Sequence, residues 1–193
     1  MTLQELKTQI KTPVFTSLDA AKYFPGENAG QINIQLARMA GRGDLNRLKR
    51  GVFTFPNRPI GDFALAQSMY SPSYISLETA LNNYGIIPDI AVSITSITPT
   101  TTKNISTSRG AFLYAKIKPP LFFGYQSLVD EESGLSYNLA LPEKALLDYI
   151  YIRRLRTLAD ARVDLNVLSK ARLNELAKNY PAWVRKSYEQ HNH

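Results

Sequence analysis

The chain has 193 residues, of which 44% are hydrophobic and 20% are charged, a composition typical of one large or two small globular domains. It contains no cysteine, which excludes disulfides, thiolate metal sites and cysteine nucleophiles. No apolar run approaches the roughly 18 residues that span a bilayer. The start of the chain lacks the charged and apolar segments of a signal peptide. We therefore expect a cytoplasmic protein that makes no contact with a membrane.

Positive charge is concentrated in the two terminal parts of the sequence. The net charge is +7, and residues 1–60 and 151–193 each hold nine Lys or Arg and four Asp or Glu, whereas residues 61–150 hold five and eight. Segregated positive charge is typical of proteins that bind phosphates, although a solubilising surface would have the same composition. The charge distribution therefore favours nucleic acid as a partner.

The first part of the chain predicts three short helices. Helical spacing of apolar residues predicts helices over 3–11 and 17–24, separated by a brief strand at 14–16. We expect Ser17 to cap the second helix, because serine accepts a hydrogen bond well at that position. A third helix is predicted over 28–41.

One face of the third predicted helix carries only residues that can make bidentate contacts with bases. Helical spacing places four side chains on it: Gln31, Gln35, Arg38 and Arg42. Glutamine pairs with adenine, and arginine with guanine or phosphate. A solvated helix face could have the same spacing, but such a face usually mixes acids with bases. Ile34 projects near this stripe, where it could touch a thymine methyl or tuck under the following hairpin, and Asn33 points off the stripe.

A basic hairpin is predicted directly after this helix. Strand-forming residues lie on both sides of Gly51, which permits a tight reversal or a bulge. Residues 38–58 hold six Lys or Arg against one acid, Asp44. Three side chains of the hairpin would reach phosphates or the minor groove: Arg47, Lys49 and Arg50. Three helices and a basic hairpin in this order predict a winged helix-turn-helix over residues 1–58 that binds double-stranded DNA.

Residues 59–193 predict a mixed α/β domain, so the expected fold class is α+β. The predicted strands span 91–98, 110–118, 121–129 and 135–141. The predicted helices span 61–70, 76–84 and 157–179, the last with a break near 163–164. A further helix begins at Pro142, since proline is favoured at the first helical position. Residues 99–108 are expected to form a polar loop, and 130–134 a solvated acidic turn.

No catalytic constellation is evident in the sequence. Both histidines, His191 and His193, lie in a tail expected to be disordered, and the chain has neither a Walker A motif nor a dinucleotide fingerprint. Asp130 followed by Glu143 and Lys144 suggests a metal-dependent nuclease as an alternative, but on a strand the last two would need to be two residues apart to share a face. We expect no enzymatic activity, no cofactor and no metal.

Three stretches are similar to segments of one known family. They read GDLNRLKRGVF at 43–53, YISLETALNNYGIIP at 74–88 and PEKALLD at 142–148. They resemble the AbiEi family, the antitoxins and transcriptional repressors of type IV toxin–antitoxin systems. The resemblance covers roughly residues 12–155, and its middle stretch is the most distinctive.

The resemblance implies a winged helix that binds an operator and represses its own operon. It also implies a C-terminal domain, here residues 59–193, that counters a nucleotidyltransferase-like toxin encoded next door, without a need for stable binding to that toxin. A stand-alone regulator, or a protein-interaction module built on the acidic middle of the chain, is the alternative. Repressors often bind two half-sites, so a homodimer or paired binding on DNA is expected.

Overall fold

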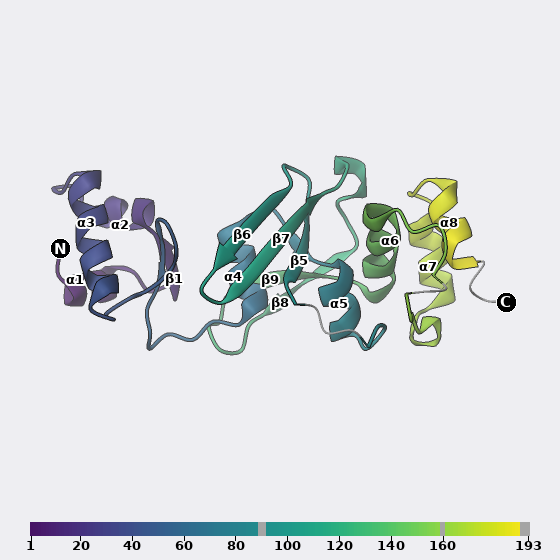
Figure 1. Ribbon diagram of the computed structural model, residues 1–193, viewed down its shortest axis with the longest axis horizontal. Coiled ribbons are helices and arrows are strands. Elements are labelled where there is room, and N and C mark those ends of the chain that lie inside the picture. Colours follow the sequence, from purple (N-terminus) through teal and green to yellow (C-terminus); the bar gives the residue numbers. More distant parts are fainter. Residues whose placement is uncertain (89–91, 159–160, 190–193) are drawn as a thin grey trace.

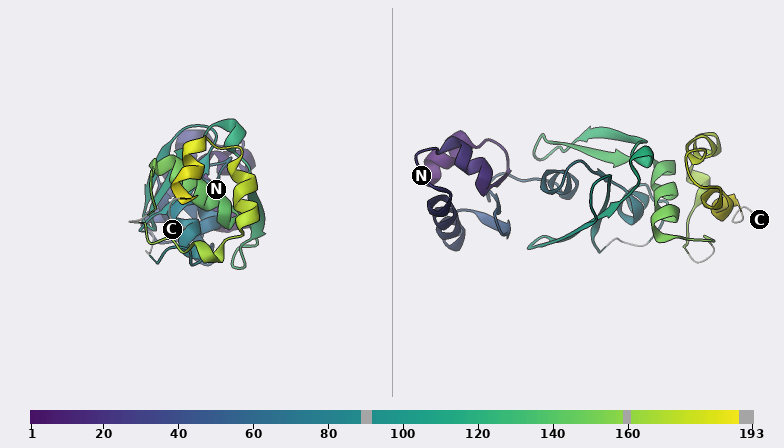
Figure 2. Two further views of the ribbon diagram at one scale, coloured as in Figure 1. Left: turned by 90° about the vertical axis from the view of Figure 1, so that its right-hand side faces the viewer. Right: turned by 90° about the horizontal axis from the view of Figure 1, so that it is seen from above.

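The computed structural model describes residues 1–88, 92–158 and 161–189, and within them the fold is α+β. The helices are α1 (Leu3–Gln9), α2 (Ser17–Tyr23), α3 (Ala29–Gly41), α4 (Asp62–Met69), α5 (Leu77–Asn83), α6 (Pro142–Arg153), α7 (Lys170–Ala177) and α8 (Ala182–Glu189). The strands are β1 (Val14–Thr16), β2 (Asn46–Lys49), β3 (Val52–Thr54), β4 (Tyr74–Ile75), β5 (Ile94–Thr98), β6 (Lys103–Thr107), β7 (Gly110–Lys116), β8 (Tyr125–Val129) and β9 (Ser136–Ala140). Helices α1 to α3 lie at one end of an elongated molecule and α6 to α8 at the other (Figures 1 and 2).

The first three helices pack with a small antiparallel sheet of strand order β1-β3-β2. Their shared core includes Phe15, Ile32 and Leu36, all buried. Helix α2 is capped by Thr16 and not by Ser17 as predicted. The Thr16 hydroxyl accepts the Asp19 N–H at 3.1 Å, and the Asp19 carboxylate accepts the Thr16 N–H at 2.9 Å. A capping box requires the acidic residue to lie three positions after the cap. Asp19 lies three positions after Thr16 but only two after Ser17.

The larger sheet has six strands in the order β6-β7-β5-β4-β9-β8. Its β4–β9 and β5–β7 pairs are parallel and the other pairs are antiparallel. Helix α4 packs on β4, β5 and β9, and α5 packs on β5 and α6. A second apolar cluster, larger than the first, fills the space between these elements. We call residues 1–55 the head and residues 61–189 the body.

Two predictions about the body are wrong. Residues 99–108 do not form a loop throughout, because β6 pairs with β7 from Lys103 to Thr107. Ile105 is the buried side chain of this edge strand, so its polar residues resemble a loop in sequence. The helix predicted from residue 157 begins only at Lys170, where the Ser169 hydroxyl accepts the Arg172 N–H.

Smaller differences concern element boundaries. The strand predicted over 91–98 is described from Ile94, and its first position lies outside the described residues. The strand predicted from 121 begins at Tyr125, after a 3₁₀ turn at Pro119–Leu121. The helix at Pro142 begins where it was predicted, and the predicted hairpin around residues 130–134 is formed by β8 and β9.

The turn between β8 and β9 contacts Gly61, directly after the linker of residues 56–60 that joins head and body. The Asp130 carboxylate accepts hydrogen bonds from the Gly61 N–H at 3.1 Å and the Ser133 N–H at 3.0 Å. Burial alone would raise the pKa of Asp130, but a hydrogen bond from the Ser133 hydroxyl, the two backbone hydrogen bonds and the positive charge of Arg109 outweigh burial, and the pKa is lowered. The turn predicted to be solvated therefore supports the start of α4.

A buried polar network joins the body sheet to the C-terminal helices. Lys144 and Asp148 are one turn apart on α6, form an ion pair and are fully buried. The Asp148 carboxylate accepts hydrogen bonds from the hydroxyls of Tyr74 and Ser76, both at 2.9 Å, and Tyr180 at 2.6 Å. Burial lowers the pKa of Lys144, and Asp148 opposes that shift. We name these five residues the Asp148 network.

Replacing one member of the ion pair should destabilise the protein more than replacing both. We expect Asp148→Ala to lower the free energy of unfolding by about 3–5 kcal/mol, because it leaves the Lys144 ammonium buried without a counter-charge. The double variant Lys144→Met/Asp148→Leu, which removes both charges and keeps apolar volume, should lose less than Asp148→Ala. Urea denaturation monitored by circular dichroism measures each value. A double variant at least as unstable as Asp148→Ala would contradict the pairing.

Candidate nucleic-acid interface

Helix α3 has one buried side and one exposed side. Ile32, Leu36 and Met39 face the core of the head. On the opposite side Asn33, Ile34, Ala37 and Arg38 are exposed. The Ile34 side chain is 54% exposed and therefore does not tuck under the hairpin. The exposed side thus offers a polar amide, a branched apolar group and a guanidinium within two turns of one helix.

The two glutamines of the predicted stripe are engaged at the start of α3. The Gln31 side-chain oxygen accepts the Asn28 N–H at 3.2 Å and completes the capping box of the helix. Gln35 is half-buried, and its Nε2 donates to Glu27 at 2.5 Å. Its Oε1 atom is buried and has no hydrogen-bond partner. The expectation that four side chains share one free face therefore does not hold for Gln35, because Glu27 in the preceding loop holds its amide.

The two arginines of the stripe differ in their surroundings. Arg38 is exposed, and its guanidinium makes no ion pair or hydrogen bond with any residue that the structure describes. Arg42 is also exposed, but its Nε and Nη2 both lie 2.9 Å from Asp44 Oδ2. Arg38 is therefore free to meet an anion, whereas Arg42 must first leave its carboxylate partner.

The β2–β3 hairpin carries the other three predicted contacts. A bulge between Arg47 and Lys49 redirects the intervening Leu48. Leu48 and Val52 are buried in the apolar cluster of the body and not in that of the head. One side of the hairpin thus packs on the body, and Arg47 and Arg50 remain exposed. The domain boundary predicted at residue 58 assigns the hairpin to the head. Two residues of the hairpin nevertheless belong to the apolar core of the body.

A lysine of the body lies beside the hairpin. Strand β2 contacts β6, the edge strand that begins at Lys103. The pKa of Lys49 is lowered by burial and then by the nearby positive charge of Lys103. Neither ammonium has an acidic partner within the described residues. Sequence reasoning missed Lys103 because a contact between two edge strands of different sheets leaves no local pattern.

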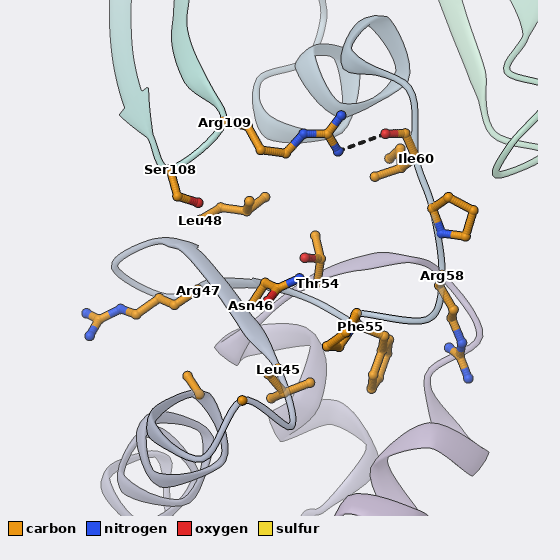
Figure 3. A pocket seen from close by; sticks show the side chains of 14 residues that line it. Leu45, Asn46, Arg47, Leu48, Thr54, Phe55, Arg58, Ile60, Ser108 and Arg109 are labelled. Carbon is orange, nitrogen blue, oxygen red and sulfur yellow. Dashed lines mark hydrogen bonds between the residues drawn. The ribbon is translucent and has the colours of Figure 1, made fainter.

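A cavity of about 410 Å³ lies between the hairpin, the linker and the β6–β7 turn (Figure 3). Arg109 spans one side of it, donating from Nη1 to the Ile60 carbonyl at 2.8 Å and pairing with Asp62 at 2.6 Å. Arg58 points away from the cavity (Figure 3), donates to the Lys7 carbonyl at 2.9 Å and lies 4.3 Å from the centre of the Phe55 ring. The linker between head and body is therefore fastened on both sides.

The residues considered for nuclease chemistry are engaged elsewhere. Glu143 accepts the Ser169 N–H at 2.9 Å and lies 3.6 Å from the Arg172 guanidinium. Asp130 supports Gly61, and Lys144 belongs to the Asp148 network. In the described part of the chain, no group of three or more His, Cys, Asp or Glu side chains could hold a metal ion. His191 and His193 lie outside the described residues.

Compared with protein-family models the sequence has no match, and a search of curated proteins finds none either. None of the helices in the described ranges has the length and apolar character needed to cross a membrane.

If the exposed side of α3 meets duplex DNA, releasing Arg42 from Asp44 should strengthen that contact. We then expect Asp44→Asn to improve affinity for a duplex by about 0.5–1 kcal/mol, because the variant breaks a surface ion pair and removes one negative charge beside Arg42. Fluorescence anisotropy with a labelled duplex measures the change. The matched control is Glu175→Gln, which neutralises an exposed acid on α7 and should leave affinity unchanged. Weaker binding by Asp44→Asn would contradict this account of Arg42.

Proposed function

We propose that the protein is a sequence-specific DNA-binding transcriptional repressor whose head acts as a winged helix-turn-helix. The observation that carries the proposal is the exposed side of α3 beside a hairpin with unpaired basic side chains. An α-helix fits the major groove, and a basic hairpin next to it can grip the adjacent backbone. In this proposal the β2–β3 hairpin is the wing.

The chemistry of α3 supports a division of the contacts. Arg38 can bond both acceptors of a guanine, Asn33 can pair with adenine, and Ile34 can meet a thymine methyl. Arg42 joins them once it leaves Asp44. Gln31 contributes only if it gives up the helix cap, and Gln35 is least available because Glu27 holds it.

The hairpin supports phosphate binding. Arg47 and Arg50 are exposed, and Lys49 lies next to the body residue Lys103. Two unpaired ammonium groups held close together repel each other, so an anion between them is favourable. Phosphate is the anion that duplex DNA supplies, and these contacts would set orientation and not sequence.

We propose further that the body counters a nucleotidyltransferase-like toxin, as in type IV toxin–antitoxin systems. The support is the resemblance of residues 43–53, 74–88 and 142–148 to AbiEi antitoxins. A stand-alone regulator with the same head, or an interaction module, is the alternative. The neighbouring gene distinguishes them, because an antitoxin requires a toxin partner in its operon.

Loss of the two α3 arginines should abolish preference for the operator. We expect Arg38→Ala and Arg42→Ala each to weaken binding to DNA from upstream of the gene by about 1–3 kcal/mol, because each removes a base contact. Lys49→Ala should weaken all duplexes alike and lower the salt slope by about one unit. Anisotropy titrations at several salt concentrations measure both.

The control for these variants is Lys178→Ala, which removes an exposed charge at the end of α7. It should bind like the wild type. Unchanged operator affinity in the Arg38→Ala/Arg42→Ala double variant would refute α3 as the recognition helix.

The antitoxin proposal is tested by co-expression with the neighbouring nucleotidyltransferase. We expect the full chain to restore growth, and the Arg38→Ala/Arg42→Ala variant to restore it equally when expressed from an independent promoter. A fragment that lacks residues 1–58 is a poor test of the body, because the body would lose Leu48 and Val52 from its core. Failure of the wild type to restore growth would favour the stand-alone regulator.

A further inference from the structure

A second group of basic side chains lines a cleft formed by elements of the body. Helices α6 and α8, which contribute to it, lie at the end of the molecule opposite the head (Figure 1). The end of β7, the end of α6 and the start of α8 surround this cleft, which has a volume of about 730 Å³. Five basic side chains line it, with no acidic residue among the lining: Lys116, Lys118, Arg153, Arg154 and Arg156. The proposed DNA contacts of the head leave this cleft unexplained.

Two of the five cations are already engaged within the protein. Arg153 makes two hydrogen bonds to Glu78, from Nε at 2.6 Å and from Nη2 at 3.0 Å, and so ties α6 to α5. The Arg156 guanidinium lies 4.7 Å from the centre of the Trp183 ring. Because both guanidinium groups already have partners, Arg153 and Arg156 form the walls of the cleft and do not supply free charge to a ligand.

The other three cations are free. Lys116, Lys118 and Arg154 are exposed, and their charged groups form no hydrogen bond or ion pair with any described residue. Arg154 adopts the left-handed conformation, with φ of 56°, and its N–H caps α6 by donating to Ile150. Its backbone is therefore fixed at the cleft and not on a loose loop. Three unpaired positive charges around one cleft are unfavourable unless an anion joins them.

One wall of the cleft is aromatic. The ring of Trp183 stacks on that of Tyr151, with centroids 6.1 Å apart and planes inclined by 18°. The Arg156 guanidinium also lies over the same indole ring. Such a surface suits a flat heterocycle that packs against the edge of the Trp183 ring and against the Arg156 guanidinium.

We infer that this cleft binds a nucleoside di- or triphosphate. Its phosphates would meet Lys116, Lys118 and Arg154, since guanidinium and ammonium groups both bind phosphate. Its base would lie beside Trp183 and Arg156. The volume falls within the roughly 300–1,000 Å³ typical of small-molecule sites. An acidic peptide is a poorer fit, because it spreads its charges along an extended chain, whereas the three free cations line a single cleft.

The inference does not rest on DNA binding by the head, because the cleft is lined by residues of the body. If both hold, the protein is a regulator with a separate nucleotide site. The test can therefore be made without DNA.

Isothermal titration calorimetry of the full chain with ATP, GTP, ADP and inorganic triphosphate tests the site. We expect at least one nucleotide to bind more tightly than inorganic triphosphate. Lys118→Ala/Arg154→Gly should weaken that binding by at least about tenfold, because it removes two charged hydrogen bonds. Glycine at 154 suits the left-handed backbone and so isolates the loss of the guanidinium.

The control is Lys170→Ala/Lys178→Ala, which removes two exposed charges from α7 and should bind nucleotide like the wild type. Circular dichroism and thermal unfolding confirm that each variant is folded. No binding heat with any nucleotide, equal binding by Lys118→Ala/Arg154→Gly, or triphosphate binding as tight as ATP would overturn the assignment. The assignment would also be overturned if the wild type bound no nucleotide and Lys118→Ala/Arg154→Gly lost binding to duplex DNA. That result would make the cleft a second DNA surface.

Discussion

The carboxylate of Asp148 is the point at which distant parts of the body meet. It accepts hydrogen bonds from Tyr74 and Ser76 at β4 and from Tyr180 before α8, and it pairs with Lys144 on its own helix. A charge removed from water is tolerated only when its hydrogen bonds are made, so these partners have little freedom to move apart. The network therefore fixes α6 between the sheet and the C-terminal helices. Because the end of α6 shapes the basic cleft, the geometry of that cleft depends on a carboxylate that does not line it.

The head and the body are joined by packing as well as by the linker. Leu48 and Val52 belong to the apolar cluster of the body, although they lie on the hairpin that completes the small sheet of the head. The hairpin thus has one surface toward the body and basic residues toward solvent. Strand β2 lies against β6, so the hairpin also contacts the edge of the large sheet. Burial, and then the positive charge of Lys103 on β6, lowers the pKa of Lys49 on β2.

Local patterns predicted the parts of the fold that local interactions determine. The spacing of Ile32, Leu36 and Met39 predicted α3, and Pro142 marked the first residue of α6. The exposure of Arg38 followed from the same helical period. These patterns could not predict contacts between residues that lie far apart in the sequence.

Gln35 is held by Glu27 in a loop whose path depends on the packing of the head. Strand β6 was missed because an edge strand with Ile105 as its buried side chain has the composition of a loop. Lys144 and Asp148 have the i, i+4 spacing of a surface ion pair, and only the tertiary structure buries them. The linker is likewise held by contacts that no local pattern reveals. Arg58 donates to the carbonyls of Lys7 and Ile10 at the end of α1, and Arg109 of the body donates to the Ile60 carbonyl. One anchor thus joins the Arg58 side chain to backbone carbonyls at the end of α1, and the other joins the Ile60 carbonyl to the Arg109 side chain of the body. One residue more or fewer between Phe55 and Arg58 would therefore move the Arg58 guanidinium away from the carbonyls of Lys7 and Ile10. The spacing before Arg58 is thus set by where α1 ends.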